Sequence, residues 1–303
     1  MTLPAATAAD RPLQGAAWML VSGGCFVAVT AIVKAVGPAV PAAEAAFLRY
    51  LLGLVFLLPM IRPILAARLT REALALFALR GLVHTGAVIL WFFAMTQIPL
   101  AEVTAMNYLS PVYVTLGAAL FLGERLALRR LLAVAAALVG ALVILRPGFR
   151  ETAPGHLAML ATAVLFAASY LAAKRLSGQM SPAVVVGMLS ITVTIGLAPF
   201  AAAVWVTPTA QQLLWYFGVA VFATAGHYAM TLAFRAAPLT VTQPVTFLQL
   251  VWSVLLGALV FGEPADGWVI LGGLVIMAAV SFITWREAVV RRKAVTPALP
   301  AMK

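Results

Sequence analysis

Apolar residues run along this chain in long blocks that are separated by short polar segments. A helix needs roughly 20 apolar residues to cross about 30 Å of hydrocarbon, so blocks of this length predict membrane-spanning helices. Ten blocks qualify, at approximately residues 14–36, 43–61, 74–97, 100–122, 127–146, 155–175, 183–206, 211–235, 239–261 and 266–286.

Helix-breaking residues support this division of the chain. Proline and glycine interrupt helices and favour turns, and they recur between the apolar blocks. They occur at Gly37-Pro38 with Pro41, Arg62-Pro63, Ile98-Pro99, Arg146-Pro147-Gly148, Gly178 to Pro182, Pro208, Pro238 and Pro264. Several connections are therefore expected to be tight hairpins.

The basic residues give the expected orientation, because cytoplasmic loops of membrane proteins carry an excess of Lys and Arg. If the amino terminus is cytoplasmic, the opposite side receives only Lys34, Arg146 and Arg150. The cytoplasmic side then receives Arg11, Arg62, Arg68, Arg71, Arg125, Arg129, Arg130, Lys174, Arg175, Arg235, Arg286, Arg291, Arg292, Lys293 and Lys303. Both termini are predicted to be cytoplasmic.

The composition excludes a soluble globular protein, since 64% of the 303 residues are hydrophobic and only 10% are charged. The net charge of +11 does not indicate a nucleic-acid partner, because the basic residues are scattered over short loops. The expected environment is the lipid bilayer. Neither a cofactor nor a metal site is indicated.

The two halves of the chain resemble each other at a fixed offset. A shift of 139 residues places Pro99-Leu100 on Pro238-Leu239 and Gly123-Glu124 on Gly262-Glu263, and a shift of 140 places Lys34 on Lys174. Each half then has five spans, and an odd number forces the second half to enter the membrane in the opposite sense. Inverted repeats are typical of transporters whose substrate site lies near the membrane midplane.

The segment FLGERLALRRLLAVAAALVGALVILRPG, residues 121–148, and its weaker echo at 261–287 resemble the end of the EamA repeat of the drug/metabolite transporter superfamily. The resemblance implies an all-α integral membrane fold of ten helices, arranged as two inverted five-helix repeats around a central cavity. The repeats are expected at 1–150 and 151–290, followed by a cytoplasmic tail at 291–303. Pro264 stands in the second copy where the first has Arg125.

Within that superfamily the chain is similar to amino-acid exporters of bacterial inner membranes, including the aromatic amino-acid type. The resemblance implies a transporter that exports small metabolites by alternating access and catalyses no reaction. Amino acids are the expected substrates. The run of small residues in the fifth span, including Ala133, Ala137 and Gly140, predicts a helix-packing face or the seam of a homodimer.

Histidines within apolar spans are costly and suggest function. His84 lies in the third span, and the repeat maps His227 one helical turn from it, so both should project from the same face of equivalent helices. Trp91 shares that face. We expect these side chains to line the cavity, although each histidine could instead form a hydrogen bond with a neighbouring helix.

Polar and aromatic residues of the fourth and ninth spans also match through the repeat. Polar groups that face lipid lack hydrogen-bond partners, so these residues are expected to face the interior. Pro111 predicts a local irregularity one turn before it. The cavity is expected to include Tyr108, Ser110, Gln249 and Trp252 from these spans and Tyr170 from the sixth span, with ordinary interhelical hydrogen bonding as the alternative.

Three charged residues lie near the outer ends of spans. Arg49 and Glu102 form a candidate outer gate, because a Glu–Arg pair would neutralise two costly charges. Glu44 lies nearby and is expected to extend toward the lipid headgroups instead.

Two other function classes stay open at the level of sequence. One is a membrane enzyme acting on lipid-linked substrates, which would need carboxylates clustered around a histidine in the fold. The other is a lipid translocase or a partner subunit that transports nothing itself. Either would change the meaning of the polar residues without changing the expected fold.

Overall fold

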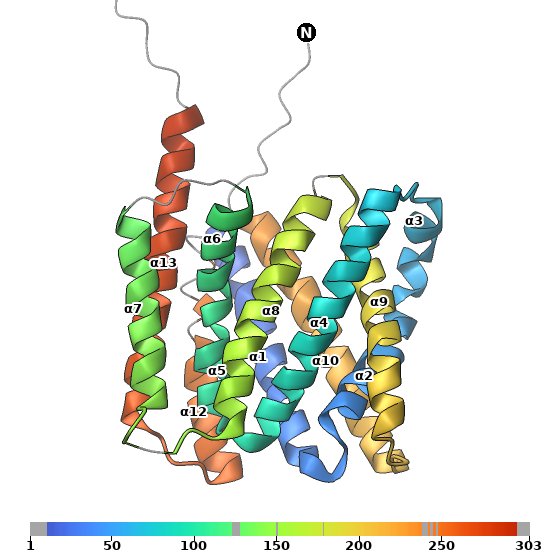
Figure 1. Ribbon diagram of the computed structural model, residues 1–303, viewed down its shortest axis with the longest axis horizontal. Helices are drawn as coiled ribbons and strands as arrows, with labels where there is room; N and C mark the ends of the chain where they lie inside the picture. The colour runs from blue at the N-terminus through green and yellow to red at the C-terminus, as the bar shows by residue number, and fades with distance from the viewer. Residues whose placement is uncertain are drawn as a thin grey trace, which may run out of the picture.

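The computed structural model describes residues 11–122, 128–149, 151–177, 179–237, 242, 245–246 and 248–295, and this part of the chain is built of helices (Figure 1). Gly123-Glu124, Arg125, Pro238-Leu239 and residues 296–303 of the expected tail lie outside the described residues. The helix α13 extends to Val295, so the first residues assigned to the tail, 291–295, are helical.

The first half contains seven α-helices and two 3-10 segments, several of them short. Their order is α1 (Pro12–Val36), η1 (Gly37–Ala39), α2 (Ala42–Gly53), η2 (Leu54–Met60), α3 (Ile61–Ala66), α4 (Arg71–Gln97), α5 (Leu100–Asn107), α6 (Leu109–Leu122) and α7 (Leu128–Leu145).

The second half repeats the first at the offset found in the sequence. It contains α8 (Pro154–Ser177), α9 (Pro182–Ala203), α10 (Ala210–Ala236), α12 (Leu248–Phe261) and α13 (Gly267–Val295). A shift of 139 residues carries the bounds of α4 onto those of α10, and the bounds of α6 onto those of α12. The two repeats therefore begin and end these helices at matching residues.

The equivalent helices run in opposite directions through the bundle. In Figure 1, α1 begins at the end of the bundle where α13 finishes, whereas its counterpart α8 begins at the opposite end. The most extensive helix contacts join the two repeats: α1 packs on α10, α4 on α8, α2 on α9, and α7 on α13. The inverted-repeat fold is thus confirmed, with its halves interdigitated rather than side by side.

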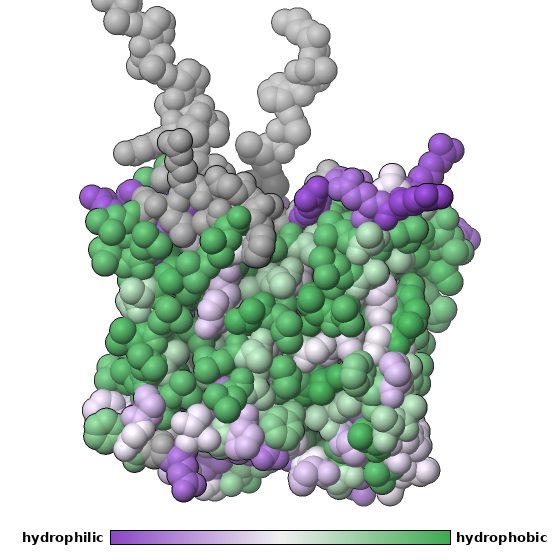
Figure 2. Space-filling view, viewed as in Figure 1, coloured by the Kyte–Doolittle hydropathy of each residue, from purple (hydrophilic) through white to green (hydrophobic). Residues whose placement is uncertain are grey.

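The face shown in Figure 2 carries a broad hydrophobic band with hydrophilic residues gathered toward its two edges, as expected for a protein in a bilayer. Among the described residues, eight helices are long and apolar enough to cross a membrane. The other two expected spans, the fourth and the ninth, are not formed by one long helix among the described residues. Residues 100–122 form two helices, α5 and α6, and the ninth span retains only the 14-residue α12 within the described part of the chain.

The break between α5 and α6 lies at Tyr108, one turn before Pro111. Pro111 has no N–H to donate to the carbonyl one turn earlier, so the predicted irregularity is confirmed there. Arg62-Pro63 lies between the spans Ala42–Pro59 and Arg71–Gln97, as predicted, although the short helix α3 (Ile61–Ala66) passes through it. Pro63 is tolerated in the first turn of α3, where the backbone N–H has no helical partner.

The helices α7 and α13 approach each other closely at two glycines. A Cβ atom on Gly140 would lie 2.8 Å from the backbone oxygen of Gly272, and one on Gly272 would lie 2.5 Å from the oxygen of Gly140. Ala133 and Ala137 are buried on the same face of α7. The small-residue face of the fifth span is therefore a packing face within the chain.

Replacing Gly140 with valine is expected to separate α7 from α13, because the new side chain would overlap backbone atoms. Overpacking of this kind costs about 1–3 kcal/mol. The apparent Tm of the purified protein in detergent, followed by intrinsic fluorescence, measures the loss. Ala136→Val, at an exposed position one turn earlier on α7, is the matched control and should leave the Tm unchanged. Equal Tm values for the two variants would contradict the close packing.

Candidate functional site

A buried histidine joins three helices in the interior of the bundle. His84 of α4 is 8% exposed. Its Nε2 is hydrogen-bonded to the hydroxyl of Tyr50 from α2, and its Nδ1 to Oγ of Ser169 from α8, each at 3.0 Å. A neutral imidazole offers one donor and one acceptor, so both hydroxyls are satisfied and His84 is fixed in orientation.

Aromatic rings surround His84 on the side of α8. The ring of Phe166 lies 5.0 Å from that of His84 and stacks on Tyr170 at 5.9 Å. Trp91, two turns along α4, meets the same phenylalanine edge to face at 6.1 Å. Its indole Nε1 is buried and has no hydrogen-bond partner among the described residues. A buried N–H of this kind is rare unless it serves a ligand or water.

The second repeat contributes His227 of α10 to the same region. Its ring packs edge to face on Phe26 of α1 at 5.0 Å. His227 lies within electrostatic range of His84 and of two cations, Arg49 and Arg80. Arg80 is buried and donates to the carbonyl of Val185 at 2.9 Å. The two histidines matched by the repeat therefore come together in space.

We call Phe26, Tyr50, His84, Trp91, Phe166, Tyr170 and His227 the aromatic–histidine cluster. His84 and Phe166 are buried, but Tyr170 is 44% exposed and His227 is also exposed. The phenol of Tyr170 lies within electrostatic range of Tyr50 and Arg80. The accessible surface of the cluster is thus aromatic and hydrogen-bonding, and its neighbouring charges are positive.

The remaining predicted cavity residues have different environments. Tyr108 donates its hydroxyl to the carbonyl of Thr246 at 2.8 Å, which ties the α5–α6 break to the second repeat. Ser110 is 3% exposed, and its Oγ has no hydrogen-bond partner among the described residues. Gln249 lies against Gly23 of α1, and Trp252 is half exposed on α12.

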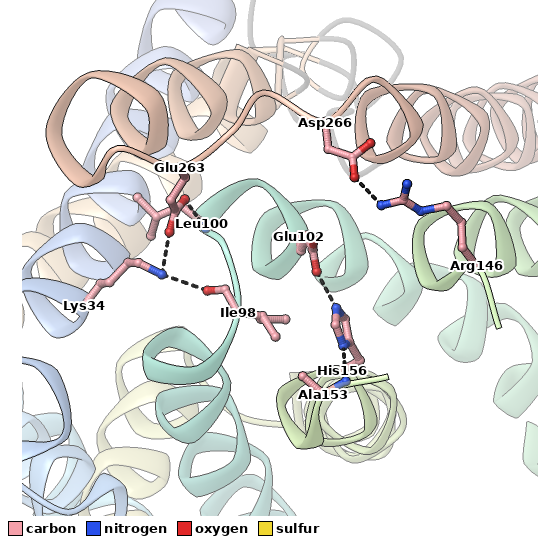
Figure 3. A network of polar contacts seen from close by, with 9 residues as sticks. All are labelled: Lys34, Ile98, Leu100, Glu102, Arg146, Ala153, His156, Glu263 and Asp266. Atoms are coloured by element: carbon pink, nitrogen blue, oxygen red, sulfur yellow. Dashed lines mark hydrogen bonds and ion pairs between the residues drawn. The ribbon is translucent and has the colours of Figure 1, made fainter. Parts of the chain in front are cut away.

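The end of the bundle at which α8 and α13 begin, which we call the ionic end, carries two ion pairs and one carboxylate–histidine pair among the described residues. They are Lys34 with Glu263, Arg146 with Asp266, and Glu102 with His156 (Figure 3). Each pair joins one residue of the first repeat to one of the second. Glu263 also accepts a hydrogen bond from the backbone N–H of Leu100 at 2.9 Å, and Lys34 donates to the carbonyl of Ile98 at 2.9 Å.

The two candidate gate residues have different partners in the structure. Glu102 is 2% exposed and pairs with His156, whereas Arg49 lies 4.0 Å above the ring of Tyr50 in the interior of the bundle. The expectation for Glu44 was wrong. Its side chain is fully buried and accepts a hydrogen bond from the N–H of Val206 at 2.9 Å, instead of reaching the headgroups.

Sequence analysis missed Tyr50, Phe166, Arg80 and His156 as members of these sites. Tyr50 and Phe166 become neighbours of His84 only through packing of α2 and α8 on α4, which no local pattern encodes. Arg80 lies one turn before His84 on α4, so helical spacing alone could have identified it. His156 offered one usable signal, since it is a histidine in the first turn of α8 where the other repeat has Ala16 at the 140-residue offset.

Comparison with known proteins identifies the family to which this architecture belongs. A multi-pass bundle of inverted repeats with a polar, aromatic interior defines the class of membrane transporters. The model of the EamA-like transporter family matches residues 13–146 and 153–285, and the chain therefore belongs to that family.

Curated relatives cover nearly the whole chain. It is 32% identical over 298 residues to a riboflavin transporter of Rhizobium johnstonii, with 94% of this chain and 95% of the relative aligned. It is 28% identical over 289 residues to a riboflavin transporter of Vibrio cholerae, with 93% and 97% aligned. It is 27% identical over 256 residues to the pseudopaline exporter CntI of Pseudomonas aeruginosa, with 84% and 90% aligned.

A solved crystal structure shares the fold, with a TM-score of 0.60 and 19% sequence identity, covering 94% of this chain and 98% of that one. Family and relatives together indicate a transporter of small metabolites in a membrane rather than an enzyme.

Proposed function

We propose that the chain transports a metabolite with a planar aromatic ring system and hydrogen-bond acceptors, by alternating access of its repeats around the aromatic–histidine cluster. The observation that carries this proposal is the chemistry of the accessible surface there. Tyr170 presents a ring face, His227 a polar ring, and Trp91 an unused N–H, while the nearby charges are Arg49 and Arg80.

Riboflavin is the first compound to test. Its flat ring system carries several acceptors, and stacking on aromatic side chains with a few placed donors is the usual way to bind such a molecule. The similarity to two riboflavin transporters supports this choice.

Export of an aromatic amino acid is the second candidate, and it is the function that the sequence resemblance implied. Arg49 and Arg80 favour it, because a guanidinium group binds a carboxylate well. The relatives include both an exporter and uptake transporters, so direction is a separate part of the proposal.

The enzyme alternative depended on carboxylates gathered around a histidine. Glu102 and Asp266 do line one cavity with His156. However, Asp266 is paired with Arg146, and Nδ1 of His156 already accepts the N–H of Ala153 at 3.0 Å. These groups bind the repeats to each other, which supports transport over catalysis.

Counterflow in proteoliposomes tests the proposal. Vesicles containing the purified protein and unlabelled riboflavin should take up labelled riboflavin, and vesicles loaded with tryptophan should not do so if the flavin is the substrate. The variant His84→Ala with Gln249→Ala is expected to lose at least about tenfold in initial rate, the cost of one or two lost hydrogen bonds. Uptake of neither riboflavin nor an aromatic amino acid, or an unchanged rate in the variant, would refute the assignment.

A further inference from the structure

The pair formed by Glu102 and His156 is buried at a junction between the repeats. Glu102 belongs to α5 of the first repeat and is 2% exposed, and His156 begins α8 of the second repeat and is 3% exposed. Nε2 of His156 contacts Oε2 of Glu102 directly (Figure 3). An ionised carboxylate is costly at this level of burial, so a titratable group here responds strongly to its surroundings.

The hydrogen bonds define which atom carries the proton. The backbone N–H of Ala153 donates to Nδ1 of His156 at 3.0 Å, so Nδ1 is unprotonated. The single N–H of a neutral imidazole is then on Nε2 and donates to Glu102. In this arrangement the histidine is neutral, Glu102 is the carboxylate, and the next proton to arrive has the carboxylate as its acceptor.

A cavity gives this carboxylate room for water. It has a volume of about 200 Å³ and is lined by Glu102, His156 and Asp266, with Gln97 and Pro264 among the other residues. That volume exceeds the roughly 10–15 Å³ that one water needs, and the polar lining supplies its partners. Protons can therefore reach Glu102 without opening the bundle.

The pair breaks the symmetry of the repeat. Lys34 and Glu263 have Lys174 and Glu124 as counterparts in the sequence, at offsets of 140 and 139 residues. The 139-residue shift places Val241 opposite Glu102, and the 140-residue shift that relates α1 to α8 places Ala16 opposite His156. A proton site in one half alone makes the two ends of the transporter chemically different.

We propose that Glu102, held by His156, is a proton-binding site that couples transport to a proton gradient. Protonation forms one O–H bond on the Glu102 carboxylate, breaks no covalent bond, and changes the charge of the pair from −1 to zero. The charge-assisted hydrogen bond between the repeats becomes a weaker neutral one. The weaker bond favours separation of α5 from α8, which opens the ionic end.

The charged groups around the pair set the pH of this step. Asp266 lines the same cavity and is bound to Arg146, while Lys34 and Glu263 lie beside the first turn of α5 at Ile98 and Leu100. Asp266 is the other carboxylate in the cavity, and it is therefore the site that the experiment must distinguish from Glu102.

Infrared difference spectroscopy of the full chain in lipid tests the site without a substrate. Stepwise acidification from about pH 8 should produce the carbonyl stretch of a protonated carboxylic acid on Glu102. The band should be missing in Glu102→Gln and present in Asp266→Asn. A band that persists in Glu102→Gln, or disappears in Asp266→Asn, would overturn the assignment. His156→Gln, which keeps one donor and one acceptor, should retain the band at a shifted pH, and an unshifted band would refute the role of His156.

Coupling is then measured as a ratio, and this part rests on the proposed transport of riboflavin. The rate of riboflavin uptake with a pH gradient, divided by the rate without one, should be at least about fivefold in the wild type and in Glu72→Gln. In Glu102→Gln the ratio should fall to one. A wild-type ratio of one, or an unchanged ratio in Glu102→Gln, would overturn the proposal. If riboflavin is not transported at all, the proposed substrate is refuted. The proton site is then tested by the infrared experiment alone.

Discussion

Glu263→Gln is expected to lower the free energy of unfolding by about 2–4 kcal/mol, since breaking a mostly buried ion pair leaves the partner charge uncompensated. Glu263 bonds to Lys34 and to the N–H of Leu100, and the side chains of the pair are only 12% and 18% exposed. Glutamine keeps an oxygen for Leu100 but loses the charge. A denaturant titration in detergent micelles measures the difference.

Two controls separate charge from packing in this experiment. Glu72 also joins the repeats, through Arg175, but its side chain is 73% exposed. Glu72→Gln should therefore change stability by less than about 0.5 kcal/mol. Adding Lys34→Met to Glu263→Gln removes the stranded cation and should recover most of the loss. If the double variant is as unstable as the sum of the singles, the two residues do not act as a pair.

The sequence predicts the spans and the inverted repeat, but it does not predict the ion pairs between the repeats. Apolar length and the 139-residue offset predict the spans and the inverted repeat because both depend on local composition and on duplication. They do not predict that the ends of the repeats are fastened by pairs such as Arg146 with Asp266, 120 residues apart in the chain. Such pairs depend on how α7 and α13 cross, which the close approach of Gly140 and Gly272 determines.

For the aromatic–histidine cluster, too, the sequence predicts residues on single helices but not their partners on other helices. Position within a span and the repeat identified His84 and His227 as neighbours, because both signals are carried by single helices. The partners of His84 come from α2 and α8, and no periodicity within one helix indicates them. The η2 segment, whose 3-10 geometry follows α2, was also not predictable, since a proline at position 59 permits several local conformations.

The two histidines of the cluster are expected to differ when each is replaced with phenylalanine. His84→Phe removes both ring nitrogens and leaves the hydroxyls of Tyr50 and the fully buried Ser169 without these bonds. Each stranded buried group costs about 1–3 kcal/mol, so the apparent Tm should fall and transport should fall with it. His84 is then a positioning residue that holds α2, α4 and α8 together.

His227→Phe should show the opposite pattern, because His227 is exposed and phenylalanine preserves the edge-to-face contact with Phe26. We expect a smaller Tm change than for His84→Phe and a rise of about tenfold in the KM for riboflavin counterflow, the cost of one hydrogen bond to substrate. Tyr228→Phe, at the next position and 64% exposed, should change neither quantity. A stable His84→Phe protein with no transport would reverse these roles, since the substrate would then bind to the buried histidine rather than to the accessible one.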